Sequence, residues 1–240
     1  MLKASLILLS LLPAAAQAVD VGRFKESSGA PPAPWRLQTL NDKLAPTHYA
    51  LRDWDGVNAI EAKAKASMAL MARPLSVDLA KTPVLCWRWR VDAPLKNADL
   101  RTKEGDDYAA RVYITFKIKP EALDFATRAK LRIGRAIFGD QLPDAAINYV
   151  WDNRYPVGTR EPSAYTDRVR LIVARSGAAD AGHWVDERHD VLADATQAFG
   201  PDIAAARQLA VASDTDNTGE EAHAGFADLH FVARDAPCVF

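Results

Sequence analysis

The residues best suited to chemistry are polar side chains that alternate with apolar ones along consecutive predicted strands. Arg88 and Arg90 alternate with tryptophans in one strand. Arg111 and Tyr113 alternate with apolar residues in the next, and Asn148 lies in a third. Since successive side chains of a strand point to opposite faces, all five are expected on faces turned away from the core. If these strands share one sheet, the guanidinium groups form a surface for an anionic ligand. The alternative is a solvated outer face on which arginines pair with acids of neighbouring strands.

Proton transfer on the same face is a second interpretation. Tyr113 or His230 would transfer protons, while Arg111 and Asn148 would neutralise the carboxylate of a uronate, as a polysaccharide lyase requires. The sequence lacks the G-x-S-x-G and H-E-x-x-H motifs and a phosphate-binding glycine loop. We therefore expect a protein without catalytic activity, and a lyase is the alternative.

Two acidic segments contain oxygen donors that could bind a metal ion. Asp214, Asp216 and Asn217 follow one predicted strand, and Asp106 and Asp107 precede another. Carboxylate and amide oxygens at such spacing can bind Ca²⁺, but the remaining spacing and the terminal glutamate of an EF-hand are absent. Asp and Asn also form side-chain turns at these positions, which is the preferred interpretation. Ca²⁺ is the one candidate cofactor.

The chain contains two cysteines, Cys86 and Cys238. An even number of cysteines in an exported protein favours a disulfide, which would fasten the C-terminal segment to a strand. The alternative is one buried and one exposed free thiol. The two positions lack the paired spacing of a zinc site.

Residues 1–18 have the pattern of a secretory signal peptide. Lys3 precedes an apolar run, and Ala16-Gln17-Ala18 supplies a cleavage site of small residues. The run is too short to span a bilayer, and no second apolar segment is long enough to do so. We expect residues 19–240 to form one exported, periplasmic domain. A net charge of −1 gives no electrostatic basis for binding nucleic acid.

Alternating apolar residues and frequent turn residues predict an all-β protein. The expected strands cover residues 35–40, 48–54, 57–71, 84–91, 110–118, 145–151, 168–174, 183–187, 208–213 and 226–232. Helices are expected at 120–138 and at 194–199, the second with Asp194 as its N-cap. Many strands with one or two helical excursions predict an antiparallel β-sandwich of the jelly-roll or galactose-binding-like type.

The same alternation assigns side chains to the core. Trp87 and Trp89 lie in the apolar row of their strand, so we expect core residues rather than a platform for stacking sugars. Two later strands contribute rows of their own to the predicted core: Val169, Leu171 and Val173, and Ala227, Leu229 and Phe231. Asp228 and His230 are expected on the opposite face.

Five segments resemble those of the DUF3047 family of exported bacterial proteins of unknown function. They are Cys86-Trp87-Arg88-Trp89, Gly105-Asp106-Asp107-Tyr108-Ala109-Ala110-Arg111-Val112-Tyr113, Ile147-Asn148-Tyr149-Val150-Trp151, residues 184–194, and Ser213-Asp214-Thr215-Asp216-Asn217-Thr218-Gly219. The resemblance covers nearly all of the chain after residue 18 and implies no particular activity. The expected architecture is also similar to that of carbohydrate-binding modules, which is a weak indication of function.

These observations favour an exported binding protein for a polar, anionic ligand such as an acidic glycan. Arg88, Arg90 and Arg111 would bind its charged groups, and Tyr113 and Asn148 would orient it. A polysaccharide-lyase-like enzyme and a structural envelope protein without a small ligand are the alternatives.

Overall fold

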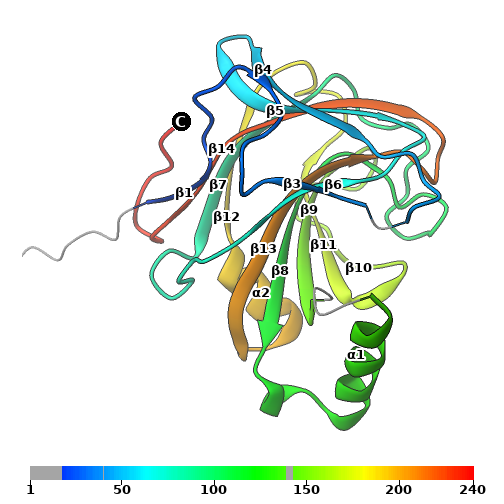
Figure 1. Cartoon of the computed structure of the whole chain (residues 1–240), viewed down its shortest axis with the longest axis vertical. Coiled ribbons are helices and arrows are strands. Elements are labelled where there is room, and N and C mark those ends of the chain that lie inside the picture. Colours follow the sequence, from blue (N-terminus) through cyan, green and yellow to red (C-terminus); the bar gives the residue numbers. More distant parts are fainter. Residues whose placement is uncertain (1–17, 40, 139–142) are drawn as a thin grey trace, which may run out of the picture.

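The computed structural model describes residues 18–39, 41–138 and 143–240, and it forms two sheets of seven strands each (Figure 1). Sheet A contains β1 (Val19–Gly22), β2 (Ser28–Gly29), β4 (His48–Trp54), β5 (Val57–Lys65), β7 (Val84–Val91), β12 (Val185–Asp190) and β14 (Glu221–Val232). Sheet B contains β3 (Arg36–Gln38), β6 (Leu70–Pro74), β8 (Tyr108–Ile118), β9 (Ala145–Asp152), β10 (Arg160–Ser163), β11 (Thr166–Ser176) and β13 (Ile203–Asp214). The expected all-β sandwich is confirmed.

The strand order gives the hydrogen-bonded neighbours of each strand. Sheet A runs β12-β7-β14-β5-β4-β2, with β1 paired to β14, and sheet B runs β10-β11-β9-β8-β13-β6-β3. Strand pairs are antiparallel except β9 and β11, which run parallel. Parallel strands need a crossover connection, and here the segment between them includes β10, which pairs with the outer edge of β11. The predicted strand at 57–71 divides into β5 and β6, which belong to different sheets, and β1, β2 and β10 were not expected.

The main core lies between the sheets and is rich in aromatic rings. Trp87 and Trp89 of β7 are 0% exposed, which confirms their predicted place in the core. The Trp87 ring lies 5.4 Å from that of Tyr149, and the Trp89 ring lies 5.7 Å from that of Trp151, both in β9. Ring pairs at these separations contribute attraction beyond the area they bury. These ring contacts between β7 and β9 are part of the core that joins sheet A to sheet B.

The faces of β11 differ from those predicted. Ile172 and Ala174 lie in the main core, whereas Leu171 and Val173 pack in a separate cluster with Leu100, Tyr108 and Val150. Val169, partly buried, joins this cluster. The predicted core face of β11 is therefore the outer one. Alternation does not distinguish the two faces here because β11 is buried on both faces at its centre.

A β-bulge changes the faces of β14. Asp228 has a φ of 54°, and the pairing with β7 shifts between Ala227 and His230. As a result Phe226 faces the core before the bulge, and Leu229 and Phe231 face it afterwards. Ala227 is buried as predicted, but it lies outside the main core cluster that contains Leu229 and Phe231.

The two predicted helices exist, with different starts. A short 3₁₀ turn (Pro120–Ala122) precedes α1 (Phe125–Phe138), which extends beyond the sandwich (Figure 1). Helix α2 (Val191–Phe199) begins earlier than expected because Asp190, not Asp194, caps it and accepts a hydrogen bond from the Ala193 N–H at 2.9 Å. Asp194 lies inside α2 and accepts a hydrogen bond from the Tyr149 hydroxyl at 2.6 Å.

The two ends of the described chain meet on sheet A. Strand β1 begins at Val19 and pairs with β14, and a disulfide joins Cys86 of β7 to Cys238. The predicted signal peptide lies outside the described residues, apart from Ala18. Among the helices of the described residues, none has the length and apolar character that crossing a membrane requires.

Replacing either core tryptophan by alanine should destabilise the fold. We expect Trp87→Ala and Trp89→Ala each to lower the free energy of unfolding by about 3–5 kcal/mol, because each removes a fully buried ring. Chemical denaturation measures this change. Tyr165→Ala, at a side chain that is 55% exposed, is the control and should leave the midpoint nearly unchanged. An unchanged midpoint in the tryptophan variants would contradict the core assignment.

Loss of the disulfide should also destabilise the protein. The bond closes a loop with a sequence separation of 152 residues, so the Cys86→Ser/Cys238→Ser variant is expected to lose about 2–5 kcal/mol of unfolding free energy. Intact mass after alkylation, with and without reductant, tests whether the bond forms in the exported protein. Two alkylated thiols without reductant would show that it does not.

Candidate functional site

The outer face of sheet B contains a cavity of about 970 Å³. Alternation in β8 places Arg111, Tyr113 and Thr115 on this face. The register pairs Tyr113 with Ala210 of β13 and Arg111 with Ala212, so short side chains stand beside long ones. This contrast in size leaves space above the sheet beside β8.

Three of the five predicted ligand-binding residues share this cavity. Tyr113 pairs directly with Asn148 across β8 and β9, and Arg111 lies two residues before Tyr113. All three line the cavity. Asn148 is 1% exposed, and its Oδ1 atom has no hydrogen-bond partner among the described residues.

Arg88 and Arg90 lie elsewhere, so the prediction that all three arginines converge on one face is wrong. Both belong to β7 of sheet A, because consecutive strands β7 and β8 enter different sheets. Arg88 forms ion pairs with Asp186 at 3.1 Å and with Asp228 at 3.6 Å. Arg90 forms an ion pair at 2.6 Å with Asp55, in the turn between β4 and β5. Arg88 pairs with acids of the neighbouring strands β12 and β14, as the solvated-face interpretation predicts, whereas Arg90 is buried and pairs with an acid in a turn.

His230 is also separated from the cavity. It lies in β14 of sheet A, buried beside the disulfide, and one ring nitrogen is 2.5 Å from the carbonyl oxygen of Asp228. Burial lowers the pKa of His230. The four residues proposed for a lyase are therefore not assembled in one place.

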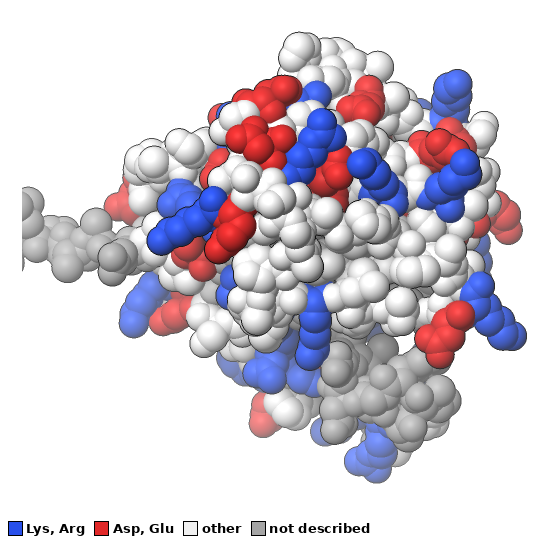
Figure 2. Space-filling view, turned by 45° about the horizontal axis from the view of Figure 1, so that its top comes forward, with Lys and Arg blue, Asp and Glu red and all other residues white. Residues whose placement is uncertain are grey.

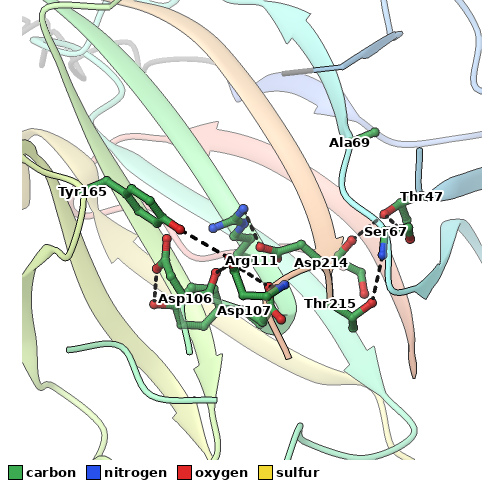
Figure 3. Close-up of polar contacts among 12 residues, drawn as sticks. Thr47, Ser67, Ala69, Asp106, Asp107, Arg111, Tyr165, Asp214 and Thr215 are labelled. Atoms are coloured by element: carbon green, nitrogen blue, oxygen red, sulfur yellow. Dashed lines mark hydrogen bonds and ion pairs between the residues drawn. The ribbon is translucent and has the colours of Figure 1, made fainter. Parts of the chain in front are cut away.

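A buried ion pair closes one end of the cavity. The guanidinium of Arg111 lies 2.7 Å from Asp214 Oδ2, and their side chains are 9% and 1% exposed (Figure 3). Asp106, Asp107 and Asp216 surround this pair, with Asp106 and Asp107 from the loop before β8 and Asp216 from the loop after β13. Four carboxylates therefore gather around one guanidinium.

Asp107 joins the two acidic loops. Its Oδ2 accepts a hydrogen bond from the Thr218 N–H at 2.7 Å, and its Oδ1 accepts one from the Asn217 N–H at 3.3 Å. Ser67 anchors the same loop from the opposite side, because its N–H donates to Thr215 Oγ1 at 3.3 Å (Figure 3). The loop after β13 is thus fixed by contacts on both sides. The predicted turn at Asp214, Asp216 and Asn217 is therefore held by two other segments of the chain, through Asp107 and Ser67.

Burial and mutual repulsion raise the pKa values of Asp106, Asp214 and Asp216. The pKa of Asp214 lies well above its usual range because the carboxyl is fully buried, and burial together with the neighbouring acids outweighs the attraction of Arg111. Burial is also the largest cause of the raised pKa values of Asp106 and Asp216. Although burial opposes its charge, Arg111 has a raised pKa because Asp214 and Asp106 stabilise the cation.

Tyr113 is a neutral hydrogen-bonding group in this environment. Burial raises the pKa of its phenol to about 12. A base must be deprotonated to accept a proton, so this phenol is poorly suited to that role near neutral pH.

Several cavity residues were not identified as site residues from sequence. Tyr165 reaches the acidic loops, where its hydroxyl lies 3.3 Å from Asn217 Oδ1. The acidic segment containing Asp106 and Asp107 was recognised, but its contact with the loop after β13 depends on the pairing of β8 with β13. Further lining residues come from several elements: Gln38, Leu44, Met68, Leu70, Thr115, Thr127, Lys130, Leu131, Arg168 and Gln208.

Figure 2 shows basic and acidic side chains interspersed over the face that it presents, in keeping with a net charge of −1.

The acidic group should make stability depend on pH. A carboxyl whose folded pKa is raised stabilises the fold at low pH, and this contribution is lost as pH rises from about 4 through the folded pKa. Asp106→Asn removes one such carboxyl, so the fall in stability between about pH 4 and pH 8 should be smaller than in the native protein. Urea denaturation across this pH range, in buffer without divalent cations, measures the free energy of unfolding of the native protein and of Asp106→Asn. Asp186→Asn in sheet A is the control, and identical pH dependence in native protein and Asp106→Asn would contradict the assignment.

Comparison with known proteins identifies the family. No curated protein matches the chain. A solved structure, that of tomato aspermy virus by X-ray crystallography, aligns over 89% of this chain and 86% of its own at 12% identity, with a TM-score of 0.15 that supports no argument. The family described as "Protein of unknown function (DUF3047)" matches residues 33–230, a range that includes every strand of sheet B. The chain therefore belongs to the DUF3047 family.

Proposed function

We propose that this protein binds, without catalysis, a polar ligand such as a glycan in the cavity on sheet B. The observation that supports this best is that Asn148 Oδ1 and Arg111 Nε, on residues that line the cavity, are buried without hydrogen-bond partners among the described residues. Buried polar atoms are nearly always paired, so such atoms in a cavity favour a ligand that completes them. The volume of about 970 Å³ lies within the usual range for small-molecule sites.

The charges around the cavity favour an uncharged glycan over the acidic one expected from sequence. The expectation of an anionic ligand depended on Arg88, Arg90 and Arg111, and the first two lie in the other sheet. Arg111 is already paired with Asp214. A ligand carboxylate would have to compete with that pair and approach Asp106 and other acids. Hydroxyl groups can instead donate to Asn148 Oδ1 and accept from Arg111 Nε without adding charge.

The walls of the cavity suit a sugar ring. Tyr113 and Tyr165 supply aromatic surface with a polar tip, and Thr115 and Gln208 add hydrogen-bonding groups. Met68 and Leu70 provide an apolar wall against which the C–H face of a sugar ring can pack. We propose that Tyr113 and Asn148 orient the ligand.

We also propose that the protein is exported to the periplasm. The support is the pattern of residues 1–18 together with the bond between Cys86 and Cys238, because disulfides persist mainly in oxidising compartments.

Glycan binding by the chain without residues 1–18 tests the proposal. A glycan array should identify neutral oligosaccharides, whose affinity isothermal titration calorimetry then measures. Asn148→Ala should weaken binding by about tenfold, because it removes the partner that the ligand hydroxyl would gain. Arg88→Gln is the matched control and should leave affinity unchanged, since Arg88 lies in sheet A. Denaturation of each variant separates loss of binding from loss of fold.

Other outcomes would replace this proposal. Tighter, salt-sensitive binding of acidic oligosaccharides would restore the anionic ligand. Depolymerisation of an acidic glycan with new unsaturated-uronate absorbance would establish a lyase. Failure of every glycan to bind the folded protein would contradict the glycan proposal and favour a structural role.

A further inference from the structure

The acidic group at the end of the cavity has the composition of a cation site. Carboxylate oxygens of Asp107, Asp214 and Asp216 lie within 4.8 Å of one another. They come from two segments that are more than one hundred residues apart in the sequence and are brought together by the pairing of β8 with β13. Convergence of acids alone is common on protein surfaces, so a second observation is needed.

That observation is a buried carboxylate oxygen without a partner. Asp214 is 1% exposed, and Arg111 contacts its Oδ2 atom. Oδ1 of the same carboxylate is buried and has no hydrogen-bond partner among the described residues. Buried oxygens of this kind are paired with a donor or a metal ion in nearly all proteins.

The local charge is also unbalanced. Asp106, Asp107, Asp214 and Asp216 supply four carboxylates, and Arg111 supplies the positive charge paired with Asp214. Burying like charges together is costly unless a counter-charge accompanies them. A divalent cation would supply that charge and a partner for Asp214 Oδ1.

We propose that Asp107, Asp214 and Asp216 bind a hard divalent cation, with Ca²⁺ the best fit. The donors are all oxygen atoms, which suit Ca²⁺ and Mg²⁺ rather than softer metals. Ca²⁺ accepts six to eight oxygens in variable geometry, so water entering from the cavity can complete a set of three carboxylates. Mg²⁺ demands stricter octahedral geometry, and a site built from two separate loops meets that demand less readily.

The surrounding hydrogen bonds hold the carboxylates in place. Asp107 Oδ1 accepts two hydrogen bonds from Asn217, from its N–H and its Nδ2, whereas Oδ2 accepts one from the Thr218 N–H and retains a lone pair for a metal. Thr215 is fixed by Ser67, on the far side of the loop (Figure 3). Because these carboxylates are already held in place, less conformational entropy is lost when the cation binds, and this favours affinity.

The site adjoins the cavity but does not depend on a glycan. Asp214 and Asp216 line the cavity, so water or a ligand oxygen can reach a cation bound there. Cation binding can therefore be measured on the protein alone, and its result is separate from the glycan test.

Calcium titration of the chain without residues 1–18, after dialysis against a chelator, tests the proposal. We expect saturable binding of one Ca²⁺ by calorimetry and a rise in the thermal midpoint that increases with Ca²⁺ concentration. Asp216→Asn should weaken Ca²⁺ binding at least tenfold, and its half-buried position makes it less disruptive than changes at Asp214. Asp186→Asn, at an acid paired with Arg88 in sheet A, should bind Ca²⁺ like the native protein.

Two results would overturn the proposal. One is a native protein that gives neither heat nor a midpoint shift with Ca²⁺, Mg²⁺ or Mn²⁺. The other is equal Ca²⁺ affinity in Asp216→Asn and the native protein, which would place any bound ion elsewhere. If Asp216→Asn fails to fold, Asp106→Asn provides the second test, because removing this neighbouring charge should also weaken Ca²⁺ binding.

Discussion

The buried ion pair between Arg111 and Asp214 is the constraint on which the cavity depends. It joins β8 to the end of β13, and both partners are almost fully enclosed. A buried pair is stable only when the charges around it are also compensated, since removing two ions from water costs several kcal/mol per ion. Asp106, Asp107 and Asp216 lie close enough to disturb that compensation. The charge of this end of the cavity, its preference among ligands and its affinity for cations all follow from how these acids are neutralised.

A cation would change what Arg111 can do. If Asp214 also bound a metal ion, its electrostatic attraction for Arg111 would weaken. The guanidinium would then be more available to an oxygen atom of the ligand. The cation and the polar ligand would then stabilise each other across one cavity, as linkage between two sites requires. Without a cation, the repulsion among these acids would be relieved by protons bound to some of the carboxyls. For this reason the same four acids are expected to make stability depend on pH and to bind a cation.

Alternation in the sequence predicted the faces of β7, β8 and β9 correctly, because each of these strands has an uninterrupted apolar row. It failed at Asp228, where a bulge inserts one residue and reverses the order of faces. It also failed in β11, whose centre is buried on both sides. Neither feature leaves a signal in the local pattern. Sheet membership was equally hidden, because β7 and β8 are consecutive strands with similar arginine patterns and yet belong to opposite sheets.

The two outer faces differ in how many of their buried polar atoms lack a partner among the described residues. On sheet A, Arg90 pairs with Asp55 and lies 4.2 Å from the ring of Trp54. His223 stacks on the same ring and contacts Glu61 at 2.8 Å, so most of these polar groups are paired within the fold, although Arg90 Nε has no partner among the described residues. On sheet B, four atoms on residues that line one cavity are buried without partners among the described residues: Asn148 Oδ1, Arg111 Nε, Asp214 Oδ1 and Arg168 Nη2. Stability accounts for the first arrangement and leaves the second unexplained, because unpaired buried polar atoms cost about 1–3 kcal/mol each. Four such atoms around one cavity support the proposal that a ligand and a cation supply those partners from outside the chain.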